Sequence, residues 1–439
     1  MTTAVPFAPI MAFPRVIGAC FVLGLSYVFY RLLSVGKRDS RLPPGPPTVP
    51  ILGNVHLIPR AGIGLKFKEW AKQYGPIYSL KVFNSTMIVL SDPEIVANLV
   101  DKKGAIYAER PPNAVVNYLT DGHFFPFEKG QSWKLKRAIA VRYLSPQRLD
   151  SHHFRIQEAE SALLMNNLLD YPEPIFEYLR LYTCSVVNTL VYGQRIKDLD
   201  SWWYQGFYKV MDGFSDLLEP GAVPPFDDFP VLWYTPGKWQ SGLKQTRQDR
   251  HEHWTRARDT VDRRRAKGDK RDCLIDEQLD ERDGKDWAYP EVAFNYLFGE
   301  IVEGGADTTA KQIFTILLAL AKNPDCQKKA QMEIDRVCGM DRGPQFLDFD
   351  DLPYVNCIVK EAFRWRPTAP TGLPRMANQD DEYNGYLIPK GSTVFLGIWA
   401  IHHQEKHYVD HEKFNPDRYL NHPKLANEYA SADWEARDK

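Results

Sequence analysis

An acid and a hydroxyl stand next to each other in the middle of a long apolar segment. Residues 290–324 carry apolar side chains at helical spacing, and the centre of this segment reads Gly304-Gly305-Ala306-Asp307-Thr308-Thr309. Glycine, aspartate and threonine are poor helix formers, and each glycine costs about 1 kcal/mol relative to alanine. Glycine lets a flat ligand approach the backbone, and a threonine hydroxyl that enters the helix ladder opens a local groove. One helix of about thirty residues with a ligand groove is therefore predicted; a tolerated kink is the alternative.

A second group of charged residues lies about fifty positions downstream. Asp351-Leu352-Pro353 predicts the start of a helix, and Glu361 and Arg364 share one face of it. An ion pair at this spacing is most often a surface pair worth a few tenths of a kcal/mol. The neighbouring residues Phe363 and Trp365 favour burial instead.

These motifs together resemble the cytochrome P-450 family, the haem-thiolate monooxygenases. The glycine-rich run resembles the groove of that family's central helix, and Glu361 to Arg364 resembles its E-x-x-R signature. Phe414-Asn415-Pro416-Asp417-Arg418 resembles the F-x-P-x-R box, in the same order and at similar spacing. The resemblance is to microsomal members, and in its details to fungal enzymes of secondary metabolism. It implies a mainly α fold with small β-sheets.

The resemblance implies roles for these residues. Asp307 and Thr308 would be catalytic, because in the family the acid and the following threonine deliver protons so that the O–O bond breaks heterolytically. A carboxylate can relay protons from solvent, and a hydroxyl both donates and accepts hydrogen bonds. Gly304 and Gly305 would line the cofactor groove. A buried triad of Glu361, Arg364 and Arg418 would support the fold without a catalytic step.

Further basic residues match positions that hold the haem propionates in the family. Trp133 and Arg137 resemble the W-x-x-x-R motif, and Arg375, after Pro374, resembles the strand residue that binds the other propionate. Residues 107–111 resemble the start of the B–C loop, a substrate-contact region that extends to Gly130. Phe127-Glu128 departs from the aromatic-glycine pair that is more usual there.

The cysteine that binds the haem iron in the family has no counterpart here. In the family it lies in F-x-x-G-x-R-x-C-x-G after the box, whereas no cysteine follows Cys357 in this sequence. Cys357 precedes Glu361 by one turn on the same helix face and suits packing better than iron ligation. We therefore expect no metal ligand in this chain, and a P-450 fold truncated at its C-terminal end, without the cysteine loop and the following helix. Haem, the expected cofactor, would then be held weakly or not at all.

An apolar stretch near the N-terminus predicts a membrane anchor. Residues 16–35 form a short apolar span, between an N-terminal lumenal segment at 1–15 and a basic, proline-rich hinge at 36–47. A cleaved signal peptide is the rival, but no small-x-small cleavage site follows. The basic flank places the domain at 48–439 in the cytosol, on the endoplasmic reticulum membrane. The sequon Asn84-Ser85-Thr86 should then stay unmodified.

Composition and patterning limit the remaining possibilities. The chain has 55 basic and 56 acidic residues, a net charge of −1, so no global field favours nucleic acid. Strands are predicted at 77–80 and 87–90, and a type I′ hairpin at Tyr383-Asn384-Gly385-Tyr386. The charged stretch 245–287 predicts a solvated helix pair. The proline- and aromatic-rich stretch 218–239 predicts a loop that caps a core, dips into the membrane interface or lines a lipophilic entrance.

The expected function is that of a monooxygenase. The resemblance implies hydroxylation or oxidation of a lipophilic small molecule, with electrons from a separate NADPH-dependent reductase. No dinucleotide or P-loop glycine motif is present in the sequence, which fits dependence on such a partner. The alternatives are a truncated, inactive chain that serves as a binding module, and a haem-thiolate isomerase or dehydratase that uses no dioxygen. Asp307 and Thr308 argue against the latter.

Overall fold

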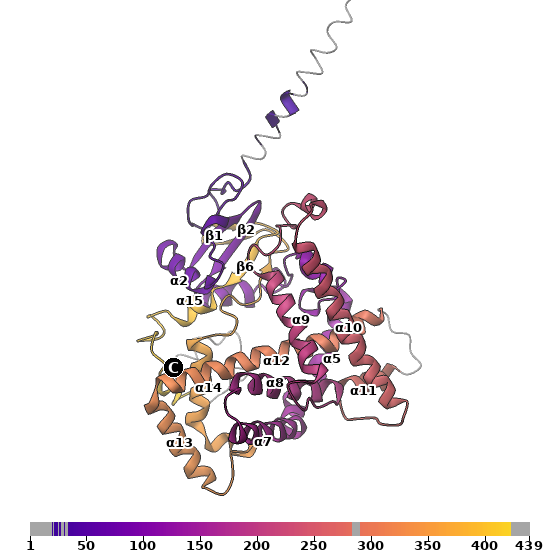
Figure 1. Cartoon of the computed structure of the whole chain (residues 1–439). Helices are drawn as coiled ribbons and strands as arrows, with labels where there is room; N and C mark the ends of the chain where they lie inside the picture. The colour runs from indigo at the N-terminus through magenta and orange to yellow at the C-terminus, as the bar shows by residue number, and fades with distance from the viewer. Residues whose placement is uncertain are drawn as a thin grey trace, which may run out of the picture.

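The computed structural model describes residues 34–282 and 290–422, together with residues 20, 22–24, 26, 27 and 30. This part of the chain is mainly helical (Figure 1), as the sequence predicts. The strands gather with helices α2 and α15 at one side of the molecule, and the long helices fill the rest. The expectation of a mainly α fold with small β-sheets is therefore confirmed.

Ten helices of nine or more residues build the described body. In chain order they are α2 (Ile63–Tyr74), α5 (Gly130–Tyr143), α7 (Phe154–Asp170), α8 (Ile175–Tyr192), α9 (Trp202–Leu218), α10 (Trp239–Arg265), α11 (Leu274–Arg282), α12 (Glu291–Lys322), α13 (Pro324–Cys338) and α14 (Pro353–Trp365). Short helices connect them: α3 (Pro93–Val96), α4 (Ala114–Leu119), α6 (Pro146–Arg148) and α15 (Ile398–His402). Single turns of 3-10 or π type are η2 (Val55–Leu57), η3 (Ala97–Asp101), η4 (Phe125–Phe127), η5 (Leu149–His153), η6 (Pro230–Tyr234), η7 (Phe346–Asp351) and η8 (Pro416–Tyr419).

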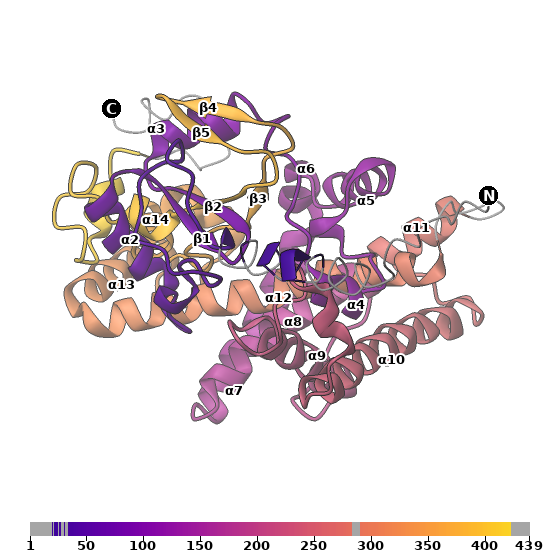
Figure 2. The same cartoon turned by 90° about the horizontal axis from the view of Figure 1, so that it is seen from above.

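Helix α12 is the element around which the others are arranged. It runs through the middle of the molecule in both views (Figures 1 and 2), and α8 packs along it. Its bounds match the predicted helix, because Pro290 precedes its first residue and Pro324 opens the next helix. The largest core cluster joins α12 to α8, α9 and α10 through residues such as Phe294, Val187 and Trp254. The glycine-rich run lies within this continuous helix.

Two small sheets complete the fold. The first has the order β1-β2-β6-β3, formed by β1 (Ile77–Val82), β2 (Ser85–Leu90), β6 (Thr393–Leu396) and β3 (Arg375–Met376). Strand β2 runs antiparallel to β1 and parallel to β6, with Met87 opposite Thr393. The second sheet is the hairpin of β4 (Asp381–Tyr383) and β5 (Tyr386–Ile388). Its turn residues Asn384 and Gly385 have φ of 51° and 80°, which confirms the predicted type I′ turn.

The charged stretch that was predicted to be solvated is only partly so. Helices α10 and α11 form the predicted pair, but Arg250, Arg264 and Asp276 are buried. Arg264 Nη1 donates to Asp276 Oδ2 at 2.6 Å, and Arg250 pairs with acids of α12. The prediction is wrong for these residues because each charge meets its partner inside the fold.

The loop between α9 and α10 caps a core cluster. Phe226 is buried and contacts Trp233 and Trp239, with ring centroids 4.0 Å and 4.9 Å away. Val231 and Tyr234, by contrast, are exposed. Of the three interpretations of this stretch, core capping is therefore confirmed for Phe226.

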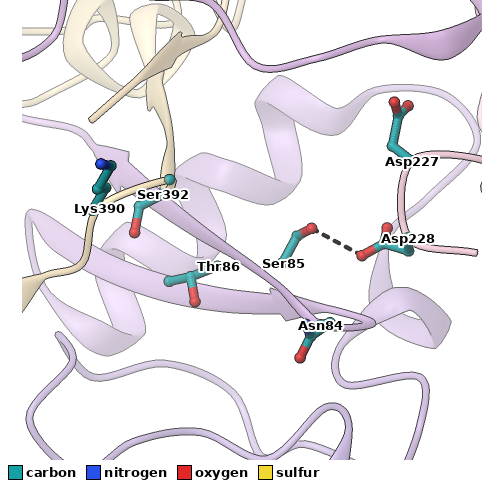
Figure 3. A pocket seen from close by; sticks show the side chains of 8 residues that line it. Asn84, Ser85, Thr86, Asp227, Asp228, Lys390 and Ser392 are labelled. Carbon is teal, nitrogen blue, oxygen red and sulfur yellow. Dashed lines mark hydrogen bonds between the residues drawn. The ribbon is translucent and has the colours of Figure 1, made fainter. Parts of the chain in front are cut away.

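Two consecutive acids fasten the same loop to its neighbours. A polar pocket of about 290 Å³ lies between this loop, the start of strand β2 and residues 390–392. In it Ser85 Oγ donates to Asp228 at 2.9 Å (Figure 3). The Asp227 carboxylate accepts from the backbone N–H of Ala114, the first residue of α4, at 3.0 Å. Burial raises the pKa of both carboxyl groups. The loop is thus tied to the first sheet and to the start of the B–C region.

The predictions for the N-terminal end concern mainly residues outside the described ranges. No helix in the described ranges is both long and apolar enough to cross a bilayer. The anchor predicted at 16–35 and the segment at 1–15 lie largely or wholly among residues that are not described. The hinge at 36–47 is described, and it packs on β1: Ser79 Oγ donates to the carbonyl of Pro43 at 2.6 Å, and Arg38 to that of Gly45 at 2.6 Å.

Candidate active site

The face of α12 that was predicted to form a groove, and that is called the groove below, is exposed at Gly304 and Thr308. Thr308 is exposed although it lies halfway along a central helix, and a Cβ added at Gly304 would have no atom within 4 Å. The Thr308 hydroxyl donates to the carbonyl of Gly304 at 2.6 Å, one turn earlier. Glycine and threonine therefore share one helix face that borders open space, as a groove for a flat ligand requires.

Gly305 serves a different purpose from Gly304. A Cβ at this position would lie 2.9 Å from the side chain of Val187 on α8. The residue is small because α8 crosses close to α12 at this point. The prediction that Gly305 lines the cofactor groove is not supported by this placement, and we assign the residue to helix packing.

Asp307 and Thr308 are not joined to each other. The Asp307 carboxylate pairs with Lys311 Nζ at 2.5 Å, and its charge contributes to the raised pKa of Tyr208 on α9, behind the larger effect of burial. Successive helix positions point about 100° apart, so the acid faces α9 while the hydroxyl faces the groove. Lys311 is more than half exposed. The Asp307 carboxylate therefore lies between the solvent and the helix face that carries Thr308.

The two donors predicted on α5 lie on one face of that helix. Trp133 and Arg137 are four residues apart, so their side chains are neighbours. Both are exposed, and Trp133 retains 38% of its accessible surface. The indole of Trp133 and the guanidinium of Arg137 are thus neighbouring, exposed hydrogen-bond donors. Such a pair is suited to bind an anion.

Arg375 lies beside a second arginine that the sequence analysis did not single out as an anion ligand. Arg375 Nη1 donates to the carbonyl of Tyr107 at 3.2 Å, and Arg110 Nη1 donates to that of Pro374 at 2.8 Å. Burial lowers the pKa of Arg110, and the charge of Arg375 lowers it further. Two partly buried like charges repel each other, so this pair favours an anionic ligand. In the sequence, the one feature that could have drawn attention to Arg110 is that it directly precedes Pro111.

The charged triad is buried beside α14. Arg364 donates twice to Glu361, from Nε to Oε2 and from Nη2 to Oε1, both at 2.7 Å, and both residues are at most 2% exposed. Arg418 Nε lies 3.5 Å from Glu361 Oε1. The structure therefore brings the three predicted residues together. Phe363, whose proximity favoured burial, is itself 49% exposed.

Cys357 is a buried thiol next to the triad. It lies on the buried face of α14, and burial raises its pKa, with Lys360, Glu333 and Asp417 as its charged neighbours. Those neighbours belong to α14, α13 and η8, whereas the open groove lies on α12. In the described ranges no three His, Cys, Asp or Glu residues form a metal-binding group. The residues placed here therefore offer no thiolate at the groove.

The residues around α12 are of the types that would hold a haem. The open face at Gly304 and Thr308 leaves space beside the helix backbone for a flat ring. Arg110 and Arg375 place two cations close together, and Trp133 and Arg137 of α5 add two donors, which are the groups that would suit the carboxylates of such a ligand.

Comparisons with known proteins agree with this geometry. The family model of cytochrome P450 matches residues 43–432. The chain is 39% identical to "Cytochrome P450 monooxygenase acuD" of Aspergillus aculeatus over 99% of its length and 82% of that protein. It is 39% identical to "Cytochrome P450 monooxygenase atE" of Aspergillus terreus over 93% of its length and 77% of that protein. For "Cytochrome P450 monooxygenase patI" of Penicillium expansum the identity is 36%, over 92% of this chain and 77% of the relative. The chain therefore belongs to the cytochrome P450 family, and is by family an oxidoreductase of the monooxygenase type.

Proposed function

We propose that this chain oxidises a lipophilic small molecule in the biosynthesis of a fungal secondary metabolite. The overall reaction is RH + O2 + 2 electrons + 2 protons giving ROH + H2O. The observation that carries the proposal is the open face of α12, where Gly304 leaves space beside the backbone and Thr308 presents a hydroxyl to it. The similarity to named fungal monooxygenases supports the pathway class.

Haem, when bound, would supply the activation of dioxygen at its iron; the residues of the chain hold it and move protons. Arg110, Arg375, Trp133 and Arg137 would bind its carboxylates through charge-assisted hydrogen bonds. Thr308 Oγ1 holds a proton at the groove face and can both donate and accept there.

Asp307 would supply protons from the solvent side. Its carboxylate is 14% exposed and is held by Lys311, whose amino group reaches the surface. A proton can pass from water to this carboxylate and from there, through water, to the face that carries the hydroxyl. The orientation of the two side chains, about 100° apart, requires such a bridging molecule.

The partner and location proposals rest on the family and on the N-terminal sequence. We propose that electrons come from a separate NADPH-dependent reductase at the endoplasmic reticulum membrane, with residues 16–35 as the anchor. Val22, Leu23 and Tyr27, which are described as helical, are 60–69% exposed, as unpartnered anchor residues would be. Removal of residues 1–35 should release the chain from sedimented membranes; continued sedimentation with intact membranes would contradict the anchor.

A spectrum decides whether this chain carries thiolate-bound haem. The full chain would be expressed in membranes with haem supplied, reduced with dithionite and treated with carbon monoxide. A red-shifted Soret band of the thiolate kind supports the monooxygenase proposal. Absence of haem, or a band of the non-thiolate kind, would refute it for this chain and favour a non-catalytic role.

The proton-transfer roles are tested separately in haem-loaded protein. Thr308→Ala should uncouple NADPH consumption from product formation and raise peroxide. The variant lacks the Thr308 hydroxyl, which in the parent chain lies at the groove face and donates to the Gly304 carbonyl. Thr309→Ala is the matched control, since that neighbouring hydroxyl points to another side of the helix. Equal coupling in the parent and both variants would contradict the role of Thr308.

A further inference from the structure

A buried ion cluster joins α10 to α12 near the groove. Arg250 of α10 donates from Nη2 to Glu300 Oε1 at 3.0 Å and from Nη1 to Glu303 Oε1 at 2.5 Å. Trp254 Nε1 also donates to Glu303, at 3.1 Å. The side chains of Arg250, Glu300 and Glu303 are 0%, 2% and 10% exposed. At Gly299 a Cβ would lie 2.4 Å from the Trp254 ring, so the two helices are in close contact here.

The cluster holds two acids for one arginine. Burial raises the pKa of Glu300 to about 8; the charge of Arg250 opposes this rise, as does that of Lys136 on α5, and the charge of Glu303 adds to it. Burial alone would lower the pKa of Arg250, but Glu303 and Glu300 raise it above its ordinary value. The cation is also held between aromatic rings, 4.9 Å from the centroid of Tyr296 and 5.7 Å from that of Phe214.

Glu300 also has a partner outside this helix pair. Its Oε2 accepts from the backbone N–H of Phe125 at 2.9 Å, and Phe125 opens the turn η4 in the B–C loop. The adjacent rings of Phe124 and Phe127 lie 5.5 Å apart, and Phe124 lies 5.7 Å from Phe214 on α9. One carboxylate therefore connects the ion cluster to an aromatic segment of the loop.

The position of Glu300 on α12 places this contact beside the groove. Glu300 precedes Gly304 by four residues and Thr308 by eight, so the three residues follow one stripe of the helix. Four residues correspond to about 6 Å along the axis. The segment 124–127 is thus fastened one turn away from the open face on which a substrate would have to lie.

We propose that Glu300 is a positioning residue that, through the Phe125 amide, holds the aromatic segment 124–127 against the groove of α12 and so shapes the substrate side of the site. The proposal rests on the proposed function for the identity of the groove as a substrate site. Arg250 holds the Glu300 carboxylate in place. Glu303 also pairs with Arg250, but the contact with the Phe125 amide is made by Glu300.

Hydrogen–deuterium exchange of the full chain tests the contact without the need for haem or reductase. Glu300→Ala removes the acceptor and should speed exchange in peptides that cover residues 121–129 about fivefold, the factor expected for one lost hydrogen bond. Glu300→Gln keeps an oxygen acceptor and should restore most of the protection. Glu303→Gln is the matched control, because it changes the same cluster and leaves the Phe125 contact in place.

Peptides from β1 and β2 report the stability of the rest of the chain. Faster exchange confined to 121–129 in Glu300→Ala, with rescue by glutamine, supports the proposal. Equal acceleration in all three variants, or in the strand peptides as well, would show a purely structural role and overturn it. No acceleration in Glu300→Ala would also overturn it. A carbon monoxide spectrum without thiolate haem, together with the expected exchange pattern, would refute the proposed function and leave the positioning contact established.

Discussion

Two buried charge clusters in this chain are built from the same residue types and differ in their balance of charge. Beside α14, one carboxylate, Glu361, meets two guanidinium groups. Between α10 and α12, one guanidinium, Arg250, meets two carboxylates. Glu361 also accepts from the backbone N–H of Asn415 at 2.8 Å. Arg364 reaches three backbone carbonyls besides Glu361.

The comparison separates a fixed support from a group that can titrate. In the α14 cluster the acid is outnumbered by cations and by donors, and Glu361 accepts from Arg364 through both of its oxygens. In the α10–α12 cluster the acids outnumber the cation, and burial raises the pKa of Glu300 to about 8. The first cluster holds three chain segments together, whereas the second lies beside the proposed substrate groove and changes charge near neutral pH.

Removal of Glu361 should have the largest effect on stability. Glu361→Ala leaves Arg364 buried without its two 2.7 Å partners, and the expected loss is about 3–5 kcal/mol in the free energy of unfolding. Urea unfolding followed by far-UV circular dichroism measures it. Lys329→Ala is the nearby control, since its pair with Asp417 is exposed, and it should change the midpoint little. Equal losses in the two variants would mean that Glu361 is no stronger a support than a surface pair.

Arg250→Met should cost less, and the cost should depend on pH. The substitution leaves Glu300 and Glu303 without their cation, which should lower stability by about 2–4 kcal/mol at pH 8. At pH 6 the loss should be smaller, because Glu300 can take up a proton and become neutral. Arg258→Met on the same helix breaks pairs whose acidic partners are more than half exposed, and should cost less than about 1 kcal/mol at either pH. If Arg250→Met lost the same stability at pH 6 and at pH 8, that result would contradict the inference that an excess of carboxylates makes this cluster sensitive to pH.

The titration of Glu300 itself should appear in the parent chain. Its folded pKa of about 8 lies above the ordinary 4.5, so between these values the folded chain keeps a proton that the unfolded chain has released. Stability from this group is therefore greatest at low pH and falls as pH rises toward 8, by at most about 1.4 kcal/mol per pH unit. Glu300→Gln should flatten the curve of unfolding free energy against pH. Parallel curves for the parent and the variant would contradict the raised pKa.

The two clusters also show what sequence can and cannot predict here. Glu361 and Arg364 are three residues apart and Arg418 belongs to a recognisable box, so local spacing was enough to group them. Arg250 lies fifty residues from Glu300, in a stretch whose many charges of both signs predicted a solvated helix pair. Which of these charged side chains is buried depends on how α10 packs against α12. No local sequence pattern predicts that packing.

The same limit applies to the groove of α12. Helical period and flanking prolines predicted the helix to within two residues, and the Asn-Gly step predicted the turn of the β4–β5 hairpin. The sequence could not tell that Gly304 faces open space while Gly305 faces Val187, because both glycines look alike until α8 is in place. Nor could it show that Arg110 stands beside Arg375, since a strand from the far end of the chain brings them together.

Of these substitutions, Thr308→Ala should change the free energy of unfolding least. In this respect the groove differs from both buried charge clusters. The hydroxyl donates to Gly304 at 2.6 Å on an exposed face, so its loss removes one weak hydrogen bond while alanine improves helix propensity. The two effects nearly cancel, and the midpoint of urea unfolding should correspond to a change within about 0.5 kcal/mol. A loss of 2 kcal/mol or more, of the order expected from the buried clusters, would mean that Thr308 supports the helix. A change within about 0.5 kcal/mol would instead be consistent with the proposed role of Thr308, which is to present its hydroxyl to a ligand beside α12 and not to support the fold.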